Sequence, residues 1–307
     1  MRRRPSKPAM TGMAIVSVAM LVNGSAAPAW GMPPAESVPQ SPVIAPHVPL
    51  TPLDGLDAQP TAPLDGLDAR TRQATADAAK SGADIEVVVM DRNTGQIISN
   101  GANQPFPIAS VVKLFIADDL LLQESQGETK LTAADRKSLD IMLRSSDDGA
   151  AQTFWDRSGG NAIISRIVAR YGLTGTTAPY NGHWDVTQST ASDLVRYYDK
   201  LLDGSGGLPP EQAGVIVNNL AQSTPTGTDG YPQRFGIPDG LYAEPVAVKQ
   251  GWFCCWSGAN QLHVSTGAIG LERRFVMVIS SLEPGDAGAA RNTVTQAVKT
   301  MFPGGHI

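Results

Sequence analysis

The stretch PFPIASVVKLF, residues 105–115, is the part of the sequence on which the fold assignment rests. An apolar run follows its two prolines and predicts a helix from Ser110 to Gln123. A serine in the first turn of a helix lies beside free backbone N–H groups and the positive end of the helix dipole. Lys113 follows three residues later, on the same face of the helix.

Ser110 and Lys113 are therefore candidates for a nucleophile and its base. The apolar neighbours of Lys113 would bury it, and a buried lysine needs a partner or a lowered pKa. A neutral lysine could take the proton of the serine hydroxyl and activate its oxygen. The alternative is an N-cap serine followed by an ordinary surface lysine, since one Ser-x-x-Lys match is expected by chance in a chain of this length.

The segments on either side predict an α+β fold. β-branched runs indicate strands at 85–90, 96–99, 246–249, 261–266 and 275–281. Helical patterns cover 70–80, 133–143, 148–157, 161–171, 190–203 and 287–301. We expect an antiparallel sheet formed by N- and C-terminal strands, with flanking helices plus an inserted helical subdomain, and a site in the crevice between the two parts.

Two later motifs follow in a fixed order. Ser146-Asp147-Asp148 opens a helical segment, and Lys249-Gln250-Gly251 ends a predicted strand. With Ser-x-x-Lys before them, these motifs resemble those of class A β-lactamases and penicillin-binding serine hydrolases, over roughly residues 80–302. The segment 80–82, Lys-Ser-Gly, also fits the last motif, but it precedes Ser110 and ends a predicted helix, so we interpret it as a helix cap.

The resemblance implies a role for each matched residue. Ser110 would attack a carbonyl carbon, with Lys113 as general base. Ser146 would pass a proton to the leaving nitrogen, and Lys249 would supply positive charge for a substrate carboxylate. Backbone N–H groups of Ser110 and Trp252 would form the oxyanion hole. No His or Cys pair lies at metal-ligand spacing, so we expect neither a metal nor a cofactor.

The substrate-binding candidates are Asp148, Gln250 and Gly251, and two of them depart from the family pattern. Asp148 replaces an asparagine, and a carboxylate cannot donate to a substrate carbonyl. It could instead pair with Lys113 and keep the amine protonated. Gln250 replaces a threonine or serine, so a hydroxyl for the substrate carboxylate is lost, and the glutamine amide would have to take its place.

The group that would hydrolyse an acyl-enzyme is missing. Class A β-lactamases use a glutamate that activates water, and segment 176–187 contains no glutamate. We expect His183 to pack or face solvent and Asp185 to cap the loop. An acyl-enzyme formed with a β-lactam should therefore be long-lived.

The N-terminal region predicts export. Residues 1–29 combine three arginines, a short apolar stretch and small residues, as in a cleaved signal peptide. The apolar stretch is short for the alternative, an uncleaved membrane anchor. Residues 30–69 are proline-rich and repeat the heptapeptide PLDGLDA, which indicates a solvated spacer before a folded domain at 70–307.

Composition limits the partners. A net charge of −5 argues against nucleic acid as a partner.

The two cysteines are the neighbours Cys254 and Cys255. We favour free or intermolecular thiols over a bond between them, because disulfide geometry normally separates the Cα atoms further.

We therefore expect a monomeric serine hydrolase, secreted or in the cell envelope, without a membrane span after signal cleavage. Its substrate would be peptide-like or β-lactam-like, with peptidoglycan as one source. The alternative is a binding module of the envelope that has kept the fold and lost catalysis.

Overall fold

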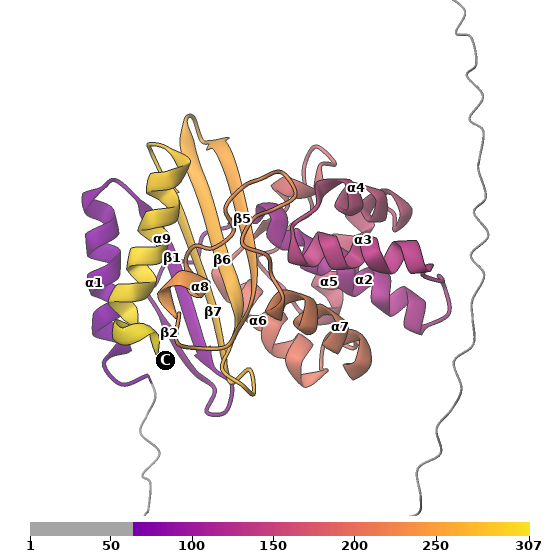
Figure 1. Cartoon of the computed structure of the whole chain (residues 1–307), viewed down its shortest axis with the longest axis horizontal. Helices are drawn as coiled ribbons and strands as arrows, with labels where there is room; N and C mark the ends of the chain where they lie inside the picture. Colours follow the sequence, from indigo (N-terminus) through magenta and orange to yellow (C-terminus); the bar gives the residue numbers. More distant parts are fainter. Residues whose placement is uncertain (1–63) are drawn as a thin grey trace, which may run out of the picture. The chain divides into compact units, whose positions relative to one another are not determined.

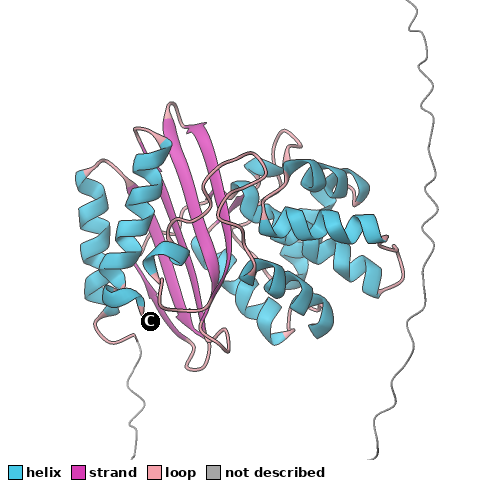
Figure 2. Cartoon of the chain, in the orientation of Figure 1, coloured by secondary structure: helices cyan, strands magenta, loops and turns pink. Residues whose placement is uncertain are grey.

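A five-stranded antiparallel sheet forms the centre of the structure, a computed structural model that describes residues 64–307 (Figures 1 and 2). The strand order is β2-β1-β7-β6-β5, so the N-terminal hairpin pairs with the C-terminal strands, and Val88 lies opposite Val278. The predicted α+β fold is confirmed. The strands are β1 (Asp84–Asp91), β2 (Gln96–Ser99), β5 (Val246–Trp256), β6 (Asn260–Ile269) and β7 (Phe275–Glu283).

Helices cover both faces of this sheet (Figure 1). One face carries α1 (Leu67–Lys80), α9 (Ala287–Met301) and the single turn α8 (Ile237–Gly240). The other carries the inserted helical part, in which six helices follow one another. They are α2 (Lys113–Ser125), α3 (Ala133–Arg144), α4 (Asp148–Arg157), α5 (Asn161–Tyr171), α6 (Ala191–Asp203) and α7 (Pro210–Ala221).

Short elements connect these layers. The 3-10 turn η1 (Ala109–Val112) precedes α2, and η2 (Trp184–Val186) lies in the loop between α5 and α6. Two short strands, β3 (Phe106–Pro107) and β4 (Gln188–Ser189), form a small second sheet, and the 3-10 turn η3 (Pro303–Gly305) follows α9. Within residues 64–307 no helix combines the length and the apolar character that crossing a bilayer requires.

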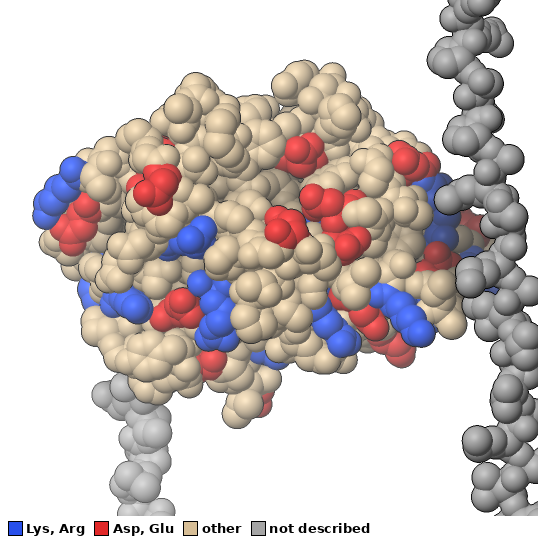
Figure 3. Space-filling view, turned by 45° about the horizontal axis from the view of Figure 1, so that its top comes forward, with Lys and Arg blue, Asp and Glu red and all other residues tan. Residues whose placement is uncertain are grey.

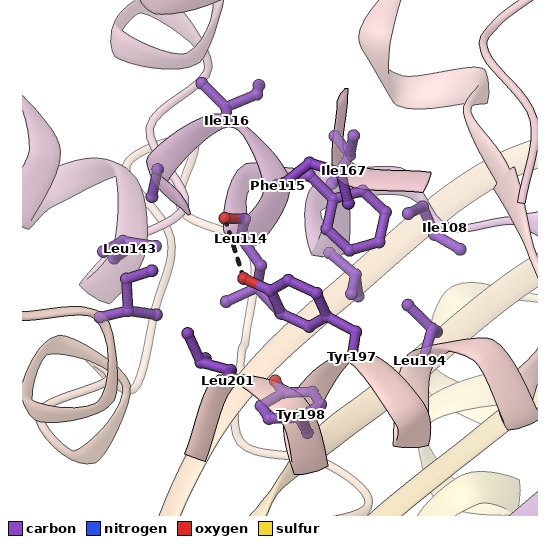
Figure 4. Close-up of a cluster of buried hydrophobic side chains, with 14 of the residues drawn as sticks. Ile108, Leu114, Phe115, Ile116, Leu143, Ile167, Leu194, Tyr197, Tyr198 and Leu201 are labelled. Carbon is purple, nitrogen blue, oxygen red and sulfur yellow. Dashed lines mark hydrogen bonds between the residues drawn. The ribbon is translucent and has the colours of Figure 1, made fainter. Parts of the chain in front are cut away.

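Helix α2 is held by a dense apolar core (Figure 4). Phe115 is fully buried and packs edge to face on Tyr197 of α6, with the ring centroids 4.9 Å apart. The Tyr197 hydroxyl also donates to the Leu114 carbonyl at 3.3 Å. Burying one aromatic or aliphatic side chain contributes about 1.5–3 kcal/mol. The core therefore fixes α2, and with it the segment that carries Ser110.

The folded part begins earlier than the predicted boundary at residue 70. Leu64 is 2% exposed and Leu67 is fully buried, and both belong to the core beneath α9. Helix α1 accordingly begins at Leu67. The second heptapeptide repeat looked like spacer because it is rich in turn residues, but its two leucines are three residues apart and anchor the helix start. The predicted signal peptide and the rest of the spacer lie outside the described residues.

The expectation of free or intermolecular thiols is wrong. Strand β5 continues far beyond the predicted 246–249, and Cys254 and Cys255 near its end form a disulfide. Neighbouring residues in a regular strand point to opposite faces. Here a β-bulge lies between Cys254 and Trp256, and Cys255 has a left-handed backbone with φ 73°. Because of this irregularity, the side chain of Cys255 does not follow the regular alternation between the two faces of the strand, which would keep it away from that of Cys254.

Candidate active site

Ser110 lies in η1, which runs directly into α2. The predicted helix therefore starts as a 3-10 turn, and the α-helix begins at Lys113 itself. Ser110 is 8% exposed. The preceding residue, Ala109, has φ 46°, and a non-glycine residue held there stores about 1–3 kcal/mol of strain. Surrounding packing must maintain this conformation, which positions the hydroxyl of the next residue.

Gly251 shows a steric reason for the glycine of the Lys-x-Gly motif. A Cβ atom at Gly251 would lie 2.6 Å from the Ile108 carbonyl oxygen and 3.3 Å from Ala109 Cβ. Strand β5 is an edge of the sheet, so its free side faces η1. The glycine thus lets the strand approach the segment before Ser110. The predicted oxyanion donors, the N–H groups of Ser110 and Trp252, belong to these two adjoining segments.

Lys113 occupies the centre of the site and is completely buried. Its Nζ donates to Ser110 Oγ at 2.7 Å, to the Ser146 carbonyl at 2.7 Å and to Asp148 Oδ1 at 2.6 Å. An ammonium has three N–H bonds and no lone pair. Ser146 Oγ at 3.3 Å is a fourth acceptor, so four acceptors share three N–H bonds and no donor is left over. Lys113 can therefore act as a base only after it has lost one proton.

Ser146 lies in the tight turn between α3 and α4, with φ 57°. The next residue, Asp147, caps α4 by accepting from Ala150 N at 2.7 Å. This turn directs Ser146 Oγ between two amines. Lys249 Nζ lies 2.7 Å away, and Lys113 Nζ 3.3 Å away.

The four residues assigned to catalysis from the sequence thus meet in one place. Lys249 of β5 is 1% exposed, and Ser146 is 4% exposed. A chain of contacts runs from Ser110 through Lys113 and Ser146 to Lys249, at 2.7, 3.3 and 2.7 Å. This geometry allows a proton to pass between the two lysines through the Ser146 hydroxyl.

The two lysines differ in their surroundings. Burial lowers the pKa of Lys113, although the neighbouring Asp148 carboxylate opposes that shift. Burial lowers the pKa of Lys249 well below its usual value, and the charge of Lys113 lowers it further. Two ammonium groups beside one hydroxyl repel each other. The arrangement favours a protonated Lys113 beside Asp148 and a neutral Lys249.

A cavity of about 260 Å³ opens over Ser110. Asp148 and Gln152 of α4 form one side, and the loop that carries η2 forms another. The ring of Trp184 in this loop lies 4.7 Å from Lys113 Nζ and covers it. The residues that line the cavity are Ala109, Ser110, Asp148, Gln152, His183, Trp184, Asp185, Asp229, Trp252 and Phe253.

Three ionisable residues of this lining were missed or given other roles by the sequence predictions. His183 was expected either to pack or to face solvent. It is exposed, and it also lines the cavity. Asp185 lines the cavity as well, where we had expected a loop cap. Asp229 had no sequence signal, because it belongs to a turn that is tied to the α3–α4 turn only in space, through Thr228 N donating to the Ser145 carbonyl at 2.8 Å.

Gln250 does not lie where the resemblance implied. Its side chain is 1% exposed, and its amide nitrogen donates to the carbonyls of Phe235 at 2.6 Å and Gln233 at 3.1 Å. Gln250 is also absent from the cavity lining. Its amide is therefore committed to a backbone loop and does not replace the missing hydroxyl.

Comparisons with known proteins agree with this architecture. The model of the "Beta-lactamase enzyme family" matches residues 69–135, which include Ser110 and Lys113. A β-lactamase from Chitinophaga pinensis superimposes with a TM-score of 0.62 at 16% identity, covering 76% of this chain and 98% of that chain. PBP-A gives a TM-score of 0.63 at 16% identity, covering 76% and 94%. A mutant of PBP-A in an acyl-enzyme complex with penicillin G gives 0.64 at 17% identity, covering 78% and 96%.

The chain therefore has the β-lactamase fold, and it belongs to the same family as a protein of mycobacteria. Its sequence is 58% identical over 258 residues to the mycobacterial protein named "Putative lipoprotein LppW", from Mycobacterium tuberculosis H37Rv and from Mycobacterium bovis. The match covers 84% of this chain and 82% of each relative.

Proposed function

We propose that this protein is an exported serine hydrolase that becomes acylated at Ser110 by a peptide-like or β-lactam-like substrate. The observation that carries the proposal is the contact of 2.7 Å between Ser110 Oγ, which lines the cavity, and Lys113 Nζ, which lies buried beneath it. The extension of this contact to Ser146 and Lys249 supplies a proton route. The acyl-enzyme of the PBP-A mutant supports acylation, and the name of the mycobacterial relatives supports a place in the cell envelope.

The reaction begins with a proton transfer between the lysines. Lys113 passes a proton through Ser146 Oγ to neutral Lys249, which leaves a lone pair on Lys113 Nζ. Lys113 then takes the proton of Ser110, and Oγ attacks the substrate carbonyl carbon. The developing oxyanion accepts from the N–H groups of Ser110 and Trp252, donors whose removal typically costs about 3–4 kcal/mol. Ser146 delivers its hydroxyl proton to the leaving atom. Lys249 then gives a proton back to Ser146 Oγ.

Deacylation is the slow half of the proposed cycle. Segment 176–187 contains no glutamate that could activate water in the manner of class A β-lactamases. Asp185 is the carboxylate of this segment that lines the cavity. Its side chain is shorter than that of glutamate, so we propose that Ser110 stays acylated and that the first turnover is completed slowly.

A second candidate function is a binding module without catalysis. The observation that favours it is the complete use of the Lys113 donors, with Asp148 as one of the acceptors. If the proton cannot leave Lys113, Ser110 stays a neutral hydroxyl. The cavity would then bind a ligand and not react with it.

Intact-protein mass spectrometry distinguishes the two functions. The protein is incubated with a fluorescent penicillin and, separately, with a neutral activated ester, and the labelled peptide is then identified. The enzyme hypothesis predicts one covalent adduct on Ser110 and none in Ser110→Ala. A folded protein, checked by circular dichroism, that forms no adduct with either reagent would refute it and favour the binding module.

A further inference from the structure

The cavity over Ser110 is lined by acidic side chains. Asp148, Asp185 and Asp229 all contribute to its wall. Among the described residues, no lysine or arginine lines it. The two lysines of the site lie beneath the wall, where Lys113 is fully buried and Lys249 is 1% exposed. Figure 3 shows acidic side chains close together near the middle of one face of the molecule.

Two of the three carboxylates have no cationic partner among the described residues. Asp148 is neutralised by Lys113 at 2.6 Å. Within residues 64–307, none of the ion pairs involves Asp185 or Asp229. In the part of the chain that the structure describes, the Asp229 side chain accepts a single hydrogen bond, a local one from Tyr231 N at 2.9 Å. Its charge raises the pKa of both Lys113 and Lys249, which indicates that its field reaches the interior of the site.

Aromatic rings complete the wall. Trp184, Trp252 and Phe253 line the cavity together with the carboxylates. Trp252 is held by stacking on Tyr231, with the ring centroids 4.5 Å apart and the planes 9° apart. Carboxylates beside rigid aromatic faces are the surroundings that bind an organic cation, because a charged amine is attracted by both.

Other occupants fit less well. A substrate carboxylate would meet two unneutralised carboxylates, and the Lys249 amine that should attract it is buried and donates to Ser146 Oγ and the Gln250 carbonyl. A metal ion would need several ligands at one point. Within residues 64–307, no three His, Cys, Asp or Glu side chains lie close enough together to hold one.

We propose that the acyl donor of this site is a peptide-like molecule with a protonated amine or guanidinium, which Asp185 and Asp229 bind inside the aromatic wall. This inference rests on the proposed acylation of Ser110. It reverses the charge preference implied by the resemblance, in which Lys249 selects a carboxylate. Substrates with a carboxylate beside the reacting carbonyl are disfavoured by the same field.

A matched set of three activated esters tests this selection. Their acyl groups have equal length and end in an ammonium, a methyl group or a carboxylate, and the acylation rate of Ser110 is followed by mass spectrometry. We expect the ammonium ester to react roughly tenfold or more faster than the carboxylate ester at low salt, with the neutral ester between them and the gap narrowing as salt rises.

Single substitutions locate the effect. Asp229→Asn and Asp185→Asn should each reduce the advantage of the ammonium ester over the neutral ester. Asp65→Asn, which removes an exposed charge beside α1, should leave that advantage intact. Equal rates for the three esters, or a preference for the carboxylate ester, would overturn the charge selection while acylation of Ser110 stands. Failure of all three esters to label Ser110 would overturn both.

Discussion

Lys113 Nζ lies 2.6 Å from Asp148 Oδ1, so a fully buried amine is paired with a carboxylate whose side chain is 70% exposed. The partner that holds the proton on Lys113 can thus be exchanged without opening the core. At this position the family pattern has asparagine. The pair therefore decides how readily the proposed base becomes neutral.

Asp148→Asn should make Lys113 a better base. Removing the carboxylate takes away an interaction that raises the pKa of Lys113, so its pKa falls further. A larger fraction of Lys113 is then neutral at any given pH, and the acidic limb of the rate profile moves to lower pH. Acylation of Ser110 by a neutral ester, measured from pH 5 to pH 9, should be several-fold faster below the plateau. An unshifted profile would mean that Asp148 does not control the base.

Ser146→Ala should slow acylation by roughly 10²–10⁴-fold, the usual contribution of a positioned proton donor. The substitution removes the hydroxyl that connects Lys113 to Lys249. Single-turnover labelling of Ser110 measures the rate. Ser145→Ala is the matched control, because its hydroxyl accepts from Thr224 and contacts neither lysine. Equal rates for the two variants would exclude the proton route.

Gly251→Ala should damage both the fold and the site. The added Cβ would lie 2.6 Å from the Ile108 carbonyl and would push β5 away from η1. Overpacking of this kind costs about 1–3 kcal/mol of unfolding free energy. Gly214→Ala in α7 is the control, because its Cβ would meet no atom within 4 Å, and alanine favours a helix. Chemical denaturation of Gly251→Ala with no loss of stability would contradict the steric account.

Glu86 on β1 should make stability depend on pH. Its side chain is 6% exposed, and burial raises the pKa of its carboxyl from 4.5 to about 7. The folded state therefore holds a proton that the unfolded state has lost between these values. The stability from the protonated form is complete below about pH 4.5 and is lost as pH rises through 7.

Glu86→Gln should remove this pH dependence, since the amide does not titrate. The free energy of unfolding, measured by urea denaturation from pH 4.5 to pH 7.5, should fall less steeply in the variant than in the unaltered protein. Glu211→Gln removes an exposed carboxylate and serves as control. The same slope in all three proteins would show that the Glu86 carboxyl does not remain protonated in the fold.

The sequence was sufficient for the parts of the site that local motifs determine. Ser110 and Lys113 are only three residues apart, and a β-branched run located the strand to which Lys249 belongs. Gln250 differs from the prediction because its side chain bonds to a loop some fifteen residues earlier, which a motif compared by residue type does not reveal. The acidic wall could not be predicted, because Asp229 reaches the cavity through a turn whose anchoring bonds join distant segments.

The limits of the fold assignment have similar causes. Leu64 and Leu67 lie in a repeat that composition marks as spacer, and only the position of α9 shows why they are buried. Helix α7 was not predicted as a separate element, since Gly214 and two asparagines, 218 and 219, weaken its pattern. Its packing against α2 and β5 supplies what the local preference lacks.

The most direct measurement of the central claim is labelling with a neutral fluorophosphonate, which reacts with activated serines and carries no charge for the cavity to select. The unaltered protein should be labelled on Ser110 alone, Ser110→Ala should not be labelled, and Lys113→Met should react far more slowly. Labelling that persists in Ser110→Ala, or that is absent from the folded unaltered protein, would contradict an activated nucleophile at Ser110.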